Sequence, residues 1–272
     1  MTTETVGLVS VVIATHNGIG TIEKAIRSIR SQTYGSIEVI VVDNHSTDGT
    51  HEVARGLADA VYQAGPERSG QWNFGARAAT GEFLLRTDDD IVFPEGTIRE
   101  AVTLMRGGAT AVSIEVLPNP IVSFWARVRY AEWSCYKYND LKGIRFLRRQ
   151  DYLDVGGLNE NLTAGEDYDL ALRLRRHGIR GVGTKNCAVH LGEPQSLSEV
   201  VRKNVYYGKT LRRYFAAEGR SGALMMFPLH KTHFTHRGEL VKAGPLVPLG
   251  FIIYQYTRYA SAAVGLIVAF QA

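Results

Sequence analysis

The chain has 272 residues, of which 45% are hydrophobic and 21% are charged, and its formal net charge is +4. A chain of this length and composition can bury a full core as one large domain or two small ones, which excludes a disordered or fibrous protein. The two cysteines, Cys135 and Cys187, belong to no motif, so a reducing compartment and no disulfide framework are expected. The first residues lack the basic and apolar regions of a signal peptide, and none is predicted.

Basic residues crowd two segments of the chain, 127–149 and 202–242. Such patches suit nucleic acid, an anionic lipid surface or a phosphorylated substrate, while a solvated helix face is the plainer interpretation of any single side chain. The sequence contains no nucleic-acid-binding motif and no interleaving of aromatic with basic residues. No nucleic-acid partner is therefore expected.

Short apolar runs alternate with amphipathic segments in the first third of the chain. The predicted strands are residues 8–14, 37–42, 60–63 and 82–86. The apolar positions of the first predicted helix recur at helical spacing and are Ile22, Ala25, Ile26 and Ile29. Thr21 is expected to cap this helix, and further helices are predicted to end near residue 57 and to cover 70–79. This alternation predicts an α/β domain with a mostly parallel sheet.

Three consecutive carboxylates, Asp88, Asp89 and Asp90, follow the last of these strands. Adjacent acids repel one another, and the usual compensation is a divalent cation, which prefers oxygen ligands. A solvated acidic turn is the alternative. The apolar strand before the run, and the acids at other strand ends, favour the metal.

Polar residues also follow the first two strands, at Thr15, His16 and Asn17 and at Asp43. Ligands of parallel sheets bind beyond the carboxyl ends of the strands. The convergence of these residues with the acid run predicts a nucleotide pocket with a metal at one side.

The second half of the chain is less regular. Strands are predicted within 109–116 and 181–190, the latter ending at His190, with a turn at 156–159. The predicted helices cover parts of 118–138, 165–178 and 196–218.

The last part of the chain differs in kind, and residues 219–272 are predicted to form a region distinct from a domain of residues 1–218. No charge occurs in 243–256 or 259–270, and Arg258 separates these two runs. One or two hydrophobic helices in the membrane interface are expected, with the basic segment before them facing lipid phosphates. A C-terminal helix packed in the core is the alternative.

Several short pieces, taken in order, resemble family 2 glycosyltransferases of the GT-A fold. They are residues 11–17, 41–50, 73–82, 88–94, 155–159 and 165–170, within a match from about 9 to about 208. Each piece alone is weak, but their order and spacing are specific. The resemblance implies a Rossmann-like, mostly parallel sheet flanked by helices, followed here by a hydrophobic helical tail, and a hexosyltransferase that uses a nucleotide sugar.

The resemblance also implies roles for individual residues. The implied nucleotide-binding residues are Thr15, His16, Asn17, Asp43, Asn73 and Asp88. Asp88 and Asp90 would hold Mn²⁺ or Mg²⁺ against the donor diphosphate, although Asp89 could replace either of them. His190 would add a ligand to the metal, with a buried structural histidine as the alternative.

Asp167 would be the general base and Glu166 its neighbour or partner. A base that deprotonates a hydroxyl acceptor for a single displacement implies inversion at the anomeric carbon. Polyprenyl-phosphate sugar synthases usually lack such a base, so the expected acceptor is a hydroxyl of a lipid-linked saccharide or glycolipid. The Gln-x-x-Arg-Trp motif of processive synthases is absent near Asp167, which favours single addition.

The enzyme is expected to use a UDP-sugar, the common donor of the family, and to associate peripherally or monotopically with the cytoplasmic face of a membrane. Two alternatives stay open. A sugar nucleotidyltransferase also uses an α/β sheet with acidic metal ligands, although residues 15–20 do not supply its glycine-rich basic loop well. The second alternative is a membrane-associated protein that binds nucleotides without turnover.

Overall fold

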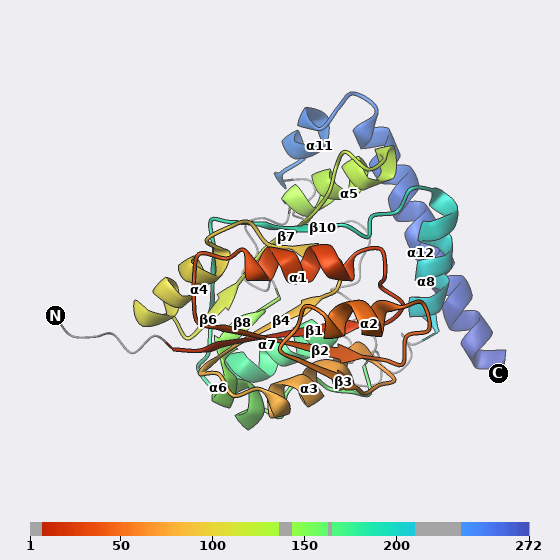
Figure 1. Cartoon of the computed structure of the whole chain (residues 1–272). Helices are drawn as coiled ribbons and strands as arrows, with labels where there is room; N and C mark the ends of the chain where they lie inside the picture. Colours follow the sequence, from red (N-terminus) through yellow and green to blue (C-terminus); the bar gives the residue numbers. More distant parts are fainter. Residues whose placement is uncertain (1–6, 136–142, 163–164, 210–234, 272) are drawn as a thin grey trace. The chain divides into compact units, whose positions relative to one another are not determined.

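The computed structural model describes residues 7–135, 143–162, 165–209 and 235–271 (Figure 1). It divides into two compact units, each built from several segments. The first unit comprises Met1–Val116, Asp140–Glu160 and Glu166–Leu191, and the second comprises Leu117–Asn139, Asn161–Gly165 and Gly192–Ala272. The predicted boundary after residue 218 lies outside the described residues and stays a prediction.

A seven-stranded sheet forms the centre of the first unit, in the order β3-β2-β1-β4-β8-β6-β9. Its parallel part consists of β3 (Ala60–Gln63), β2 (Ile37–Asp43), β1 (Val9–Thr15) and β4 (Phe83–Asp88). The strand β8 (Phe146–Arg148) runs antiparallel between β4 and β6 (Ala111–Ser113), and β9 (Gly181–Gly183) is parallel to β6. The prediction of an α/β fold with a mostly parallel sheet is confirmed.

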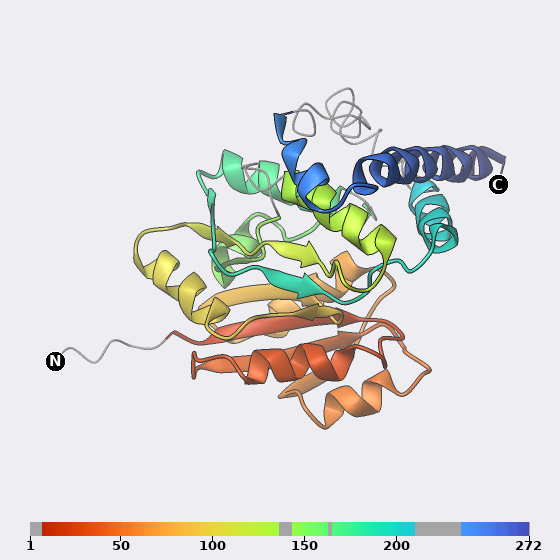
Figure 2. The same cartoon turned by 90° about the horizontal axis from the view of Figure 1, so that it is seen from above.

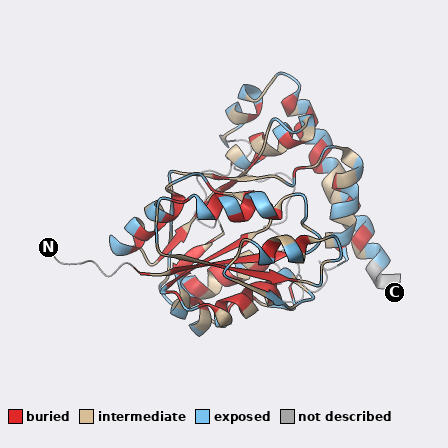
Figure 3. Ribbon diagram, in the orientation of Figure 1, coloured by how far each residue is buried: buried red, intermediate tan, exposed pale blue. Residues whose placement is uncertain are grey.

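Helices cover both faces of this sheet. Apolar residues of α1 (Ile22–Arg30), α2 (Thr50–Arg55) and α4 (Thr97–Arg106) share one core with alternate residues of β1. Residues of α3 (Arg68–Ala78), α6 (Arg149–Asp154) and α7 (Glu166–Arg176) share the opposite core with the residues of β1 between them. The central strands β1, β2 and β4 are accordingly almost entirely buried (Figure 3).

One prediction about a helix cap is corrected. Thr21 precedes α1 but does not cap it with its side chain, because its hydroxyl donates to the carbonyl of Gly18 at 3.3 Å instead. The strand predicted within 181–190 and ending at His190 is β10 (Ala188–His190), and the short strand β9 precedes it. Between them the carboxylate of Glu100 accepts hydrogen bonds from the backbone of Lys185 and Asn186, at 2.6 and 3.2 Å, and turns the chain.

The run predicted as one strand over 109–116 is divided between β6 and β7 (Val116–Pro118). The second of these belongs to a small sheet in the order β5-β10-β7, where β5 is Ile91–Val92. In this sheet His190 is paired in antiparallel register with Ile91, the residue that directly follows Asp88–Asp90 in the sequence.

The described helices of the second unit are α5 (Phe124–Cys135), α8 (Leu197–Gly208), α11 (Gly238–Lys242) and α12 (Val247–Gln271). Their shared core contains Val128, Val200, Leu240, Phe251 and Tyr254. The side chain of Ser196 caps α8 by accepting from the amide of Glu199 at 3.4 Å. Figure 2 shows α8 beside α12. Among the described residues, no helix combines the length and apolarity that crossing a membrane requires.

Candidate active site

The carboxyl ends of the three longest strands lie at one edge of the first unit's sheet. In the parallel register Thr15 is paired with Asp43, and Ala14 is paired with Asp88. The polar residues that were predicted to converge from three strand ends are therefore neighbours, as the strand order requires.

Hydrogen bonds join the loop after β1 to the loop after β2. His16 Nδ1 donates to the carbonyl of Asn44 at 2.7 Å. Asn17, with φ of 52°, donates from its amide to Ser46 Oγ at 2.8 Å and accepts from the amide of Thr47 at 2.9 Å. The two loops that were predicted to bind the nucleoside are thus joined to each other by hydrogen bonds.

Asp43 lies inside that structure. Its side chain is fully buried, accepts from the hydroxyl of Ser46 at 2.5 Å and lies 3.3 Å from His51 Nδ1. Asp43 therefore fixes the loop after β2, and its predicted contact with a nucleoside stays a prediction.

Each acid of the run has a different environment. Asp88 lies between two guanidinium groups, at 3.4 Å from Arg68 and 3.6 Å from Arg145. Asp89 accepts a short hydrogen bond from the hydroxyl of Thr15. Burial raises the pKa of Asp89 to about 7, against the effect of that hydrogen bond and with help from the neighbouring carboxylates. Asp90 Oδ2 lies 3.2 Å from His190 Nε2.

The predicted metal ligands fit a divalent cation in part. Among the described residues, no three His, Cys, Asp or Glu side chains are grouped as metal ligands. Asp90 and His190 do present an oxygen and a nitrogen donor side by side, a pair that suits Mn²⁺. Asp88 faces Arg68 and Arg145 and would have to leave them to join such a site.

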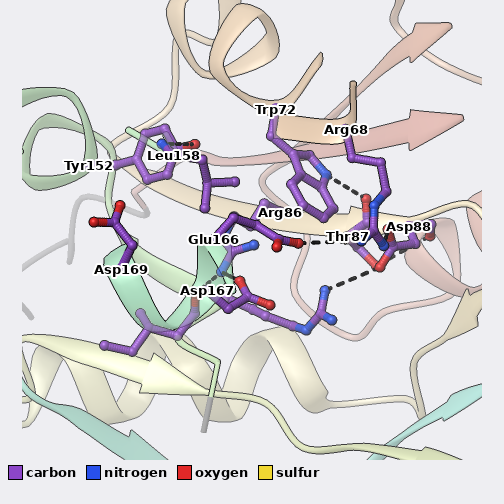
Figure 4. Close-up of polar contacts among 12 residues, drawn as sticks. Arg68, Trp72, Arg86, Thr87, Asp88, Tyr152, Leu158, Glu166, Asp167 and Asp169 are labelled. Carbon is purple, nitrogen blue, oxygen red and sulfur yellow. Dashed lines mark hydrogen bonds and ion pairs between the residues drawn. The ribbon is translucent and has the colours of Figure 1, made fainter. Parts of the chain in front are cut away.

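The predicted base, Asp167, forms an ion pair with a buried arginine (Figure 4). Arg86 Nη2 donates to Asp167 Oδ1 at 2.5 Å and to the carbonyl of Ile144 at 2.8 Å. Burial acts to raise the pKa of Asp167, but the charges of Arg86, Arg145 and Arg68 outweigh burial and hold that pKa below its usual value. Asp167 is therefore ionised at neutral pH.

Glu166, the neighbouring carboxyl, is shifted in the opposite direction. It is 7% exposed, and burial, together with the charge of Asp167, raises the pKa of Glu166 to about 7. The guanidinium of Arg68, at 3.3 Å, opposes that shift. Two adjacent carboxyls with divergent pKa values are typical of acid–base sites.

Arg68 brings the acid run and the base pair together. Its two terminal nitrogens contact Asp88 at 3.4 Å and Glu166 at 3.3 Å, from the first turn of α3. Figure 4 shows these side chains converging with Arg86 and Asp167 from separate elements. The predicted metal acid and the predicted base pair thus belong to one cluster of charged side chains.

Trp72 lies between the arginines of this cluster. The guanidinium carbon of Arg86 is 5.1 Å from the centre of the indole ring, and that of Arg68 is 5.7 Å away. The indole Nε1 donates to the carbonyl of Thr87 at 2.8 Å. This arrangement compensates the fully buried charge of Arg86 with an aromatic face as well as a carboxylate.

The side chain of Asn73 contacts residues outside the charged cluster, within the first unit. Its Nδ2 donates to the carbonyl of Leu158 and to Glu160, both at 2.8 Å, and its Oδ1 accepts from the hydroxyl of Tyr152 at 2.6 Å. Asn73 thereby holds the turn that contains Gly157, which has φ of 66°. The nucleotide contact predicted for Asn73 stays a prediction.

Three arginines of the site, Arg68, Arg86 and Arg145, were not singled out from the sequence. Arg86 alone carried a signal, because it is a charge inside the apolar run that leads to Asp88. A buried charge in a strand requires a partner, which the sequence could have prompted but not identified.

Comparison with known proteins identifies the family of the chain. The model of the family "Glycosyl transferase family 2" matches residues 10–156. Glycosyltransferase AglE of Haloferax volcanii is 31% identical over 246 residues, which cover 79% of this chain and 80% of that protein. A solved structure, the mannosyltransferase PcManGT from Pyrobaculum calidifontis with GDP-Man and Mn²⁺, has a TM-score of 0.59 at 20% identity, covering 98% of this chain and 76% of that one.

Other relatives match over a shorter part. The "GalNAc(5)-diNAcBac-PP-undecaprenol beta-1,3-glucosyltransferase" of Campylobacter jejuni is 37% identical over 91 residues, 30% of this chain and 29% of that protein. The match likewise spans 33% of a glycosyltransferase from Nostoc. The chain therefore covers about a third of the length of these two relatives.

The fold and the comparisons together define a glycosyltransferase of the GT-A fold. The chain belongs to glycosyl transferase family 2. The prediction of a GT-A-like α/β fold and of a glycosyltransferase is thereby confirmed.

Proposed function

We propose that this enzyme catalyses one inverting, metal-dependent transfer of a sugar from a nucleoside diphosphate to the hydroxyl of a lipid-linked saccharide or glycolipid. The observation that carries the proposal is the position of Asp167. Its carboxylate is kept ionised by Arg86 and belongs to the same charged cluster as Asp88, through Arg68. A base and an acid run for a diphosphate are thus held together.

In the proposed reaction, Asp167 removes the proton of the acceptor hydroxyl while the hydroxyl oxygen bonds to the anomeric carbon. The bond from that carbon to the diphosphate oxygen breaks at the same time, and the nucleoside diphosphate leaves with the electron pair. A single displacement from the opposite side inverts the anomeric configuration. Arg68 and Arg145, both beside Asp88, supply positive charge where the leaving group becomes more negative.

Asp88, Asp90 and His190 would hold Mn²⁺ or Mg²⁺. The proximity of Asp90 and His190 supports this assignment, and the related mannosyltransferase structure contains Mn²⁺. A divalent cation at this site supplies Lewis-acid neutralisation of the diphosphate. The nucleoside is assigned to the loops of Thr15, His16, Asn17 and Asp43.

The acceptor is assigned by chemistry and by relatives. An ionised base is needed for a hydroxyl but not for a phosphate acceptor, and the Campylobacter relative is named for an undecaprenol-linked substrate. A lipid-linked acceptor places the enzyme at a membrane surface, on the cytoplasmic face where nucleotide sugars are made. The donor is taken to be a UDP-sugar, with GDP-mannose as the comparison donor.

Asp167→Asn tests the proposal, with Asp169→Asn as the matched control on the same helix. Asp169 pairs with Arg173 at 2.5 Å and lies apart from the charged cluster in Figure 4. With UDP- and GDP-sugars, Mn²⁺ and a polyprenyl-diphosphate-linked saccharide, kcat/KM of the first variant should fall about 10²–10⁴-fold, while donor affinity persists. Retained transfer by Asp167→Asn, or a product that keeps the donor's anomeric configuration, would contradict it.

A further inference from the structure

The long helix α12 has an apolar outer face and a partly polar inner face. Seven large apolar side chains of this helix are between 40% and 77% exposed, namely Leu249, Ile252, Ile253, Tyr256, Val264, Ile267 and Val268. They recur at helical spacing, with the exposed Ala260 between Tyr256 and Val264, and so lie on one side of the helix, here called the outer stripe. On the other side, Gln255 and Ser261 are only 4% and 6% exposed. The inner face also buries Phe251 and Tyr254, so α12 is apolar on its exposed side as well as on its packed side, unlike a helix that faces water.

The only charged residue of α12 is withdrawn from the outer stripe. Arg258 Nη1 lies 3.1 Å from Glu132 of α5, whose side chain is 3% exposed. Gln255 donates to the same carboxylate at 3.2 Å. The sequence shows Arg258 interrupting two uncharged runs. In the folded unit its side chain, which is 39% exposed, is paired with Glu132, and the residues of the outer stripe carry no charge.

Close backbone packing joins α12 to α8. A Cβ on Gly208 would collide with the carbonyl of Ala262, and a Cβ on Gly265 would collide with the carbonyl of Val205. Contact through small residues is typical of helix pairs in lipid, where apolar side chains gain little by facing each other. The pair of helices is thus held by backbone proximity, and the large apolar side chains of α12 point outward.

We propose that the outer stripe of α12 is inserted into the apolar part of one membrane leaflet, with the helix lying in the plane of the membrane. Lipid favours the observed arrangement, with apolar side chains outside and polar groups satisfied inside, whereas water penalises it. Exposed cations lie on the helices that contact α12, including Arg202 and Lys209 on or beside α8 and Lys242 at the end of α11. These side chains suit anionic lipid headgroups.

This inference deepens the proposed function by locating the surface at which the enzyme meets its lipid-linked acceptor, and it rests on that function only for the nature of the acceptor. The membrane contact itself follows from α12 and α5 of the second unit. It can therefore fail or hold independently of the chemistry at Asp167.

The test is flotation of the purified full chain with vesicles of phosphatidylglycerol and phosphatidylethanolamine, and with vesicles of phosphatidylcholine. Val264→Asp removes an apolar side chain that is 50% exposed on the stripe, and Val182→Asp is the matched control at a valine that is 40% exposed on β9. Losing the burial of one valine should weaken vesicle binding about tenfold for Val264→Asp. The double variant Ile252→Asp/Ile267→Asp should abolish flotation, and Val182→Asp should float like the wild type.

A direct measurement accompanies flotation. A nitrobenzoxadiazole label at Ile252→Cys, in a Cys187→Ser background that leaves only the buried Cys135, should shift to the blue and resist aqueous quenchers when vesicles are added. Because the substituted positions are exposed, the thermal unfolding midpoint should not change.

Three results would overturn the inference. They are absence of wild-type flotation, flotation of the double variant like the wild type, and a wild-type dimer in solution that the double variant converts to a monomer, which would make the stripe an interface between copies. Transfer to a soluble acceptor analogue separates the two proposals. An enzyme that transfers but does not float refutes only the membrane insertion, and one that floats but does not transfer refutes only the proposed function.

Discussion

The guanidinium of Arg86 approaches the carboxylate of Asp167 from inside the sheet, with Nη2 and Oδ1 2.5 Å apart. Arg86 is 1% exposed, whereas the side chain of Asp167 is 39% exposed. The guanidinium of Arg86 is therefore held in place by β4 and Trp72, and it orients the Asp167 carboxylate on α7. The carboxylate itself stays partly accessible to solvent. A base that must accept a proton from an incoming substrate needs this combination of fixed orientation and access.

Replacing Arg86 should move the pH dependence of the reaction. The arginine lowers the pKa of Asp167, so its removal raises that pKa and protonates the base at higher pH. In Arg86→Met, the acidic limb of kcat/KM should move up by about 1–2 pH units, and Arg86→Lys should move it less. Donor affinity and the unfolding midpoint report any general damage. An acidic limb that stays in place in Arg86→Met would show that the arginine does not position or tune the base.

Glu166 should make stability fall as pH rises. Its pKa is raised from 4.5 to about 7 in the folded chain, so between these values the folded state keeps a proton that the unfolded state has lost. The free energy of unfolding therefore decreases with pH across this window. Glu166→Gln should remove the decrease and gain on the order of 1–3 kcal/mol over the wild type at pH 8 relative to pH 4.

Urea unfolding of both proteins across that pH range measures this difference. Glu23→Gln, at a carboxylate that is 53% exposed and paired only on the surface with Arg27, is the control and should run parallel to the wild type. Parallel curves for Glu166→Gln as well would mean that folding does not raise the pKa of Glu166.

Much of the fold was predictable because the first unit is built from local patterns. The residues Ile22, Ala25, Ile26 and Ile29, which were picked by helical spacing, are all fully buried. The strand ends follow equally directly, since parallel strands in the order β2-β1-β4 must place their carboxyl ends together. The division of 109–116 into two strands, and the separate strand β9 before the predicted strand that ends at His190, were not predictable, because they depend on which sheet each short strand joins and on contacts such as that of Glu100.

The charged cluster was predictable only on its acidic side. The carboxylates can be recognised in the sequence because they are adjacent, as in Asp88–Asp90 and Glu166–Asp167. Their arginine partners do not, because Arg68 is 98 residues from Glu166 and Arg86 is 81 residues from Asp167. Propensity and periodicity carry no information on pairs at such separations, which arise only when the sheet brings α3, β4 and α7 together.

Asn73→Ala should destabilise the first unit more than it weakens donor binding. The side chain makes four hydrogen bonds inside the fold, to Leu158, Glu160 and Tyr152, and its loss leaves buried partners unsatisfied. A loss of about 2–4 kcal/mol in the free energy of unfolding is expected. Asn119→Ala, which removes a single hydrogen bond to Ile121, should cost far less.

Calorimetric titration with a UDP-sugar and Mn²⁺ complements these unfolding measurements. Donor affinity of folded Asn73→Ala within about twofold of the wild type is the expected result, because the hydrogen bonds of Asn73 all serve the turn around Gly157. A large loss of donor affinity without a loss of stability would instead support the nucleotide contact implied by the family resemblance.

His190→Ala distinguishes a metal ligand from a structural histidine. His190 Nε2 lies 3.2 Å from Asp90 Oδ2, close enough for both atoms to bind one cation. If they do, His190→Ala and Asp90→Asn should each weaken Mn²⁺ binding in the presence of a nucleoside diphosphate by at least ~10-fold. Electron paramagnetic resonance of free Mn²⁺ measures this without any turnover. His177→Ala, at an exposed histidine whose Nδ1 contacts the carbonyl of Arg173 at 2.9 Å, is the matched control.

Asp88→Asn tests whether Asp88 is a further metal ligand, because Asp88 faces Arg68 and Arg145 at 3.4 and 3.6 Å. An effect as large as that of Asp90→Asn would mean that Asp88 leaves the arginines for the cation, whereas unchanged Mn²⁺ affinity would assign Asp88 to the arginines.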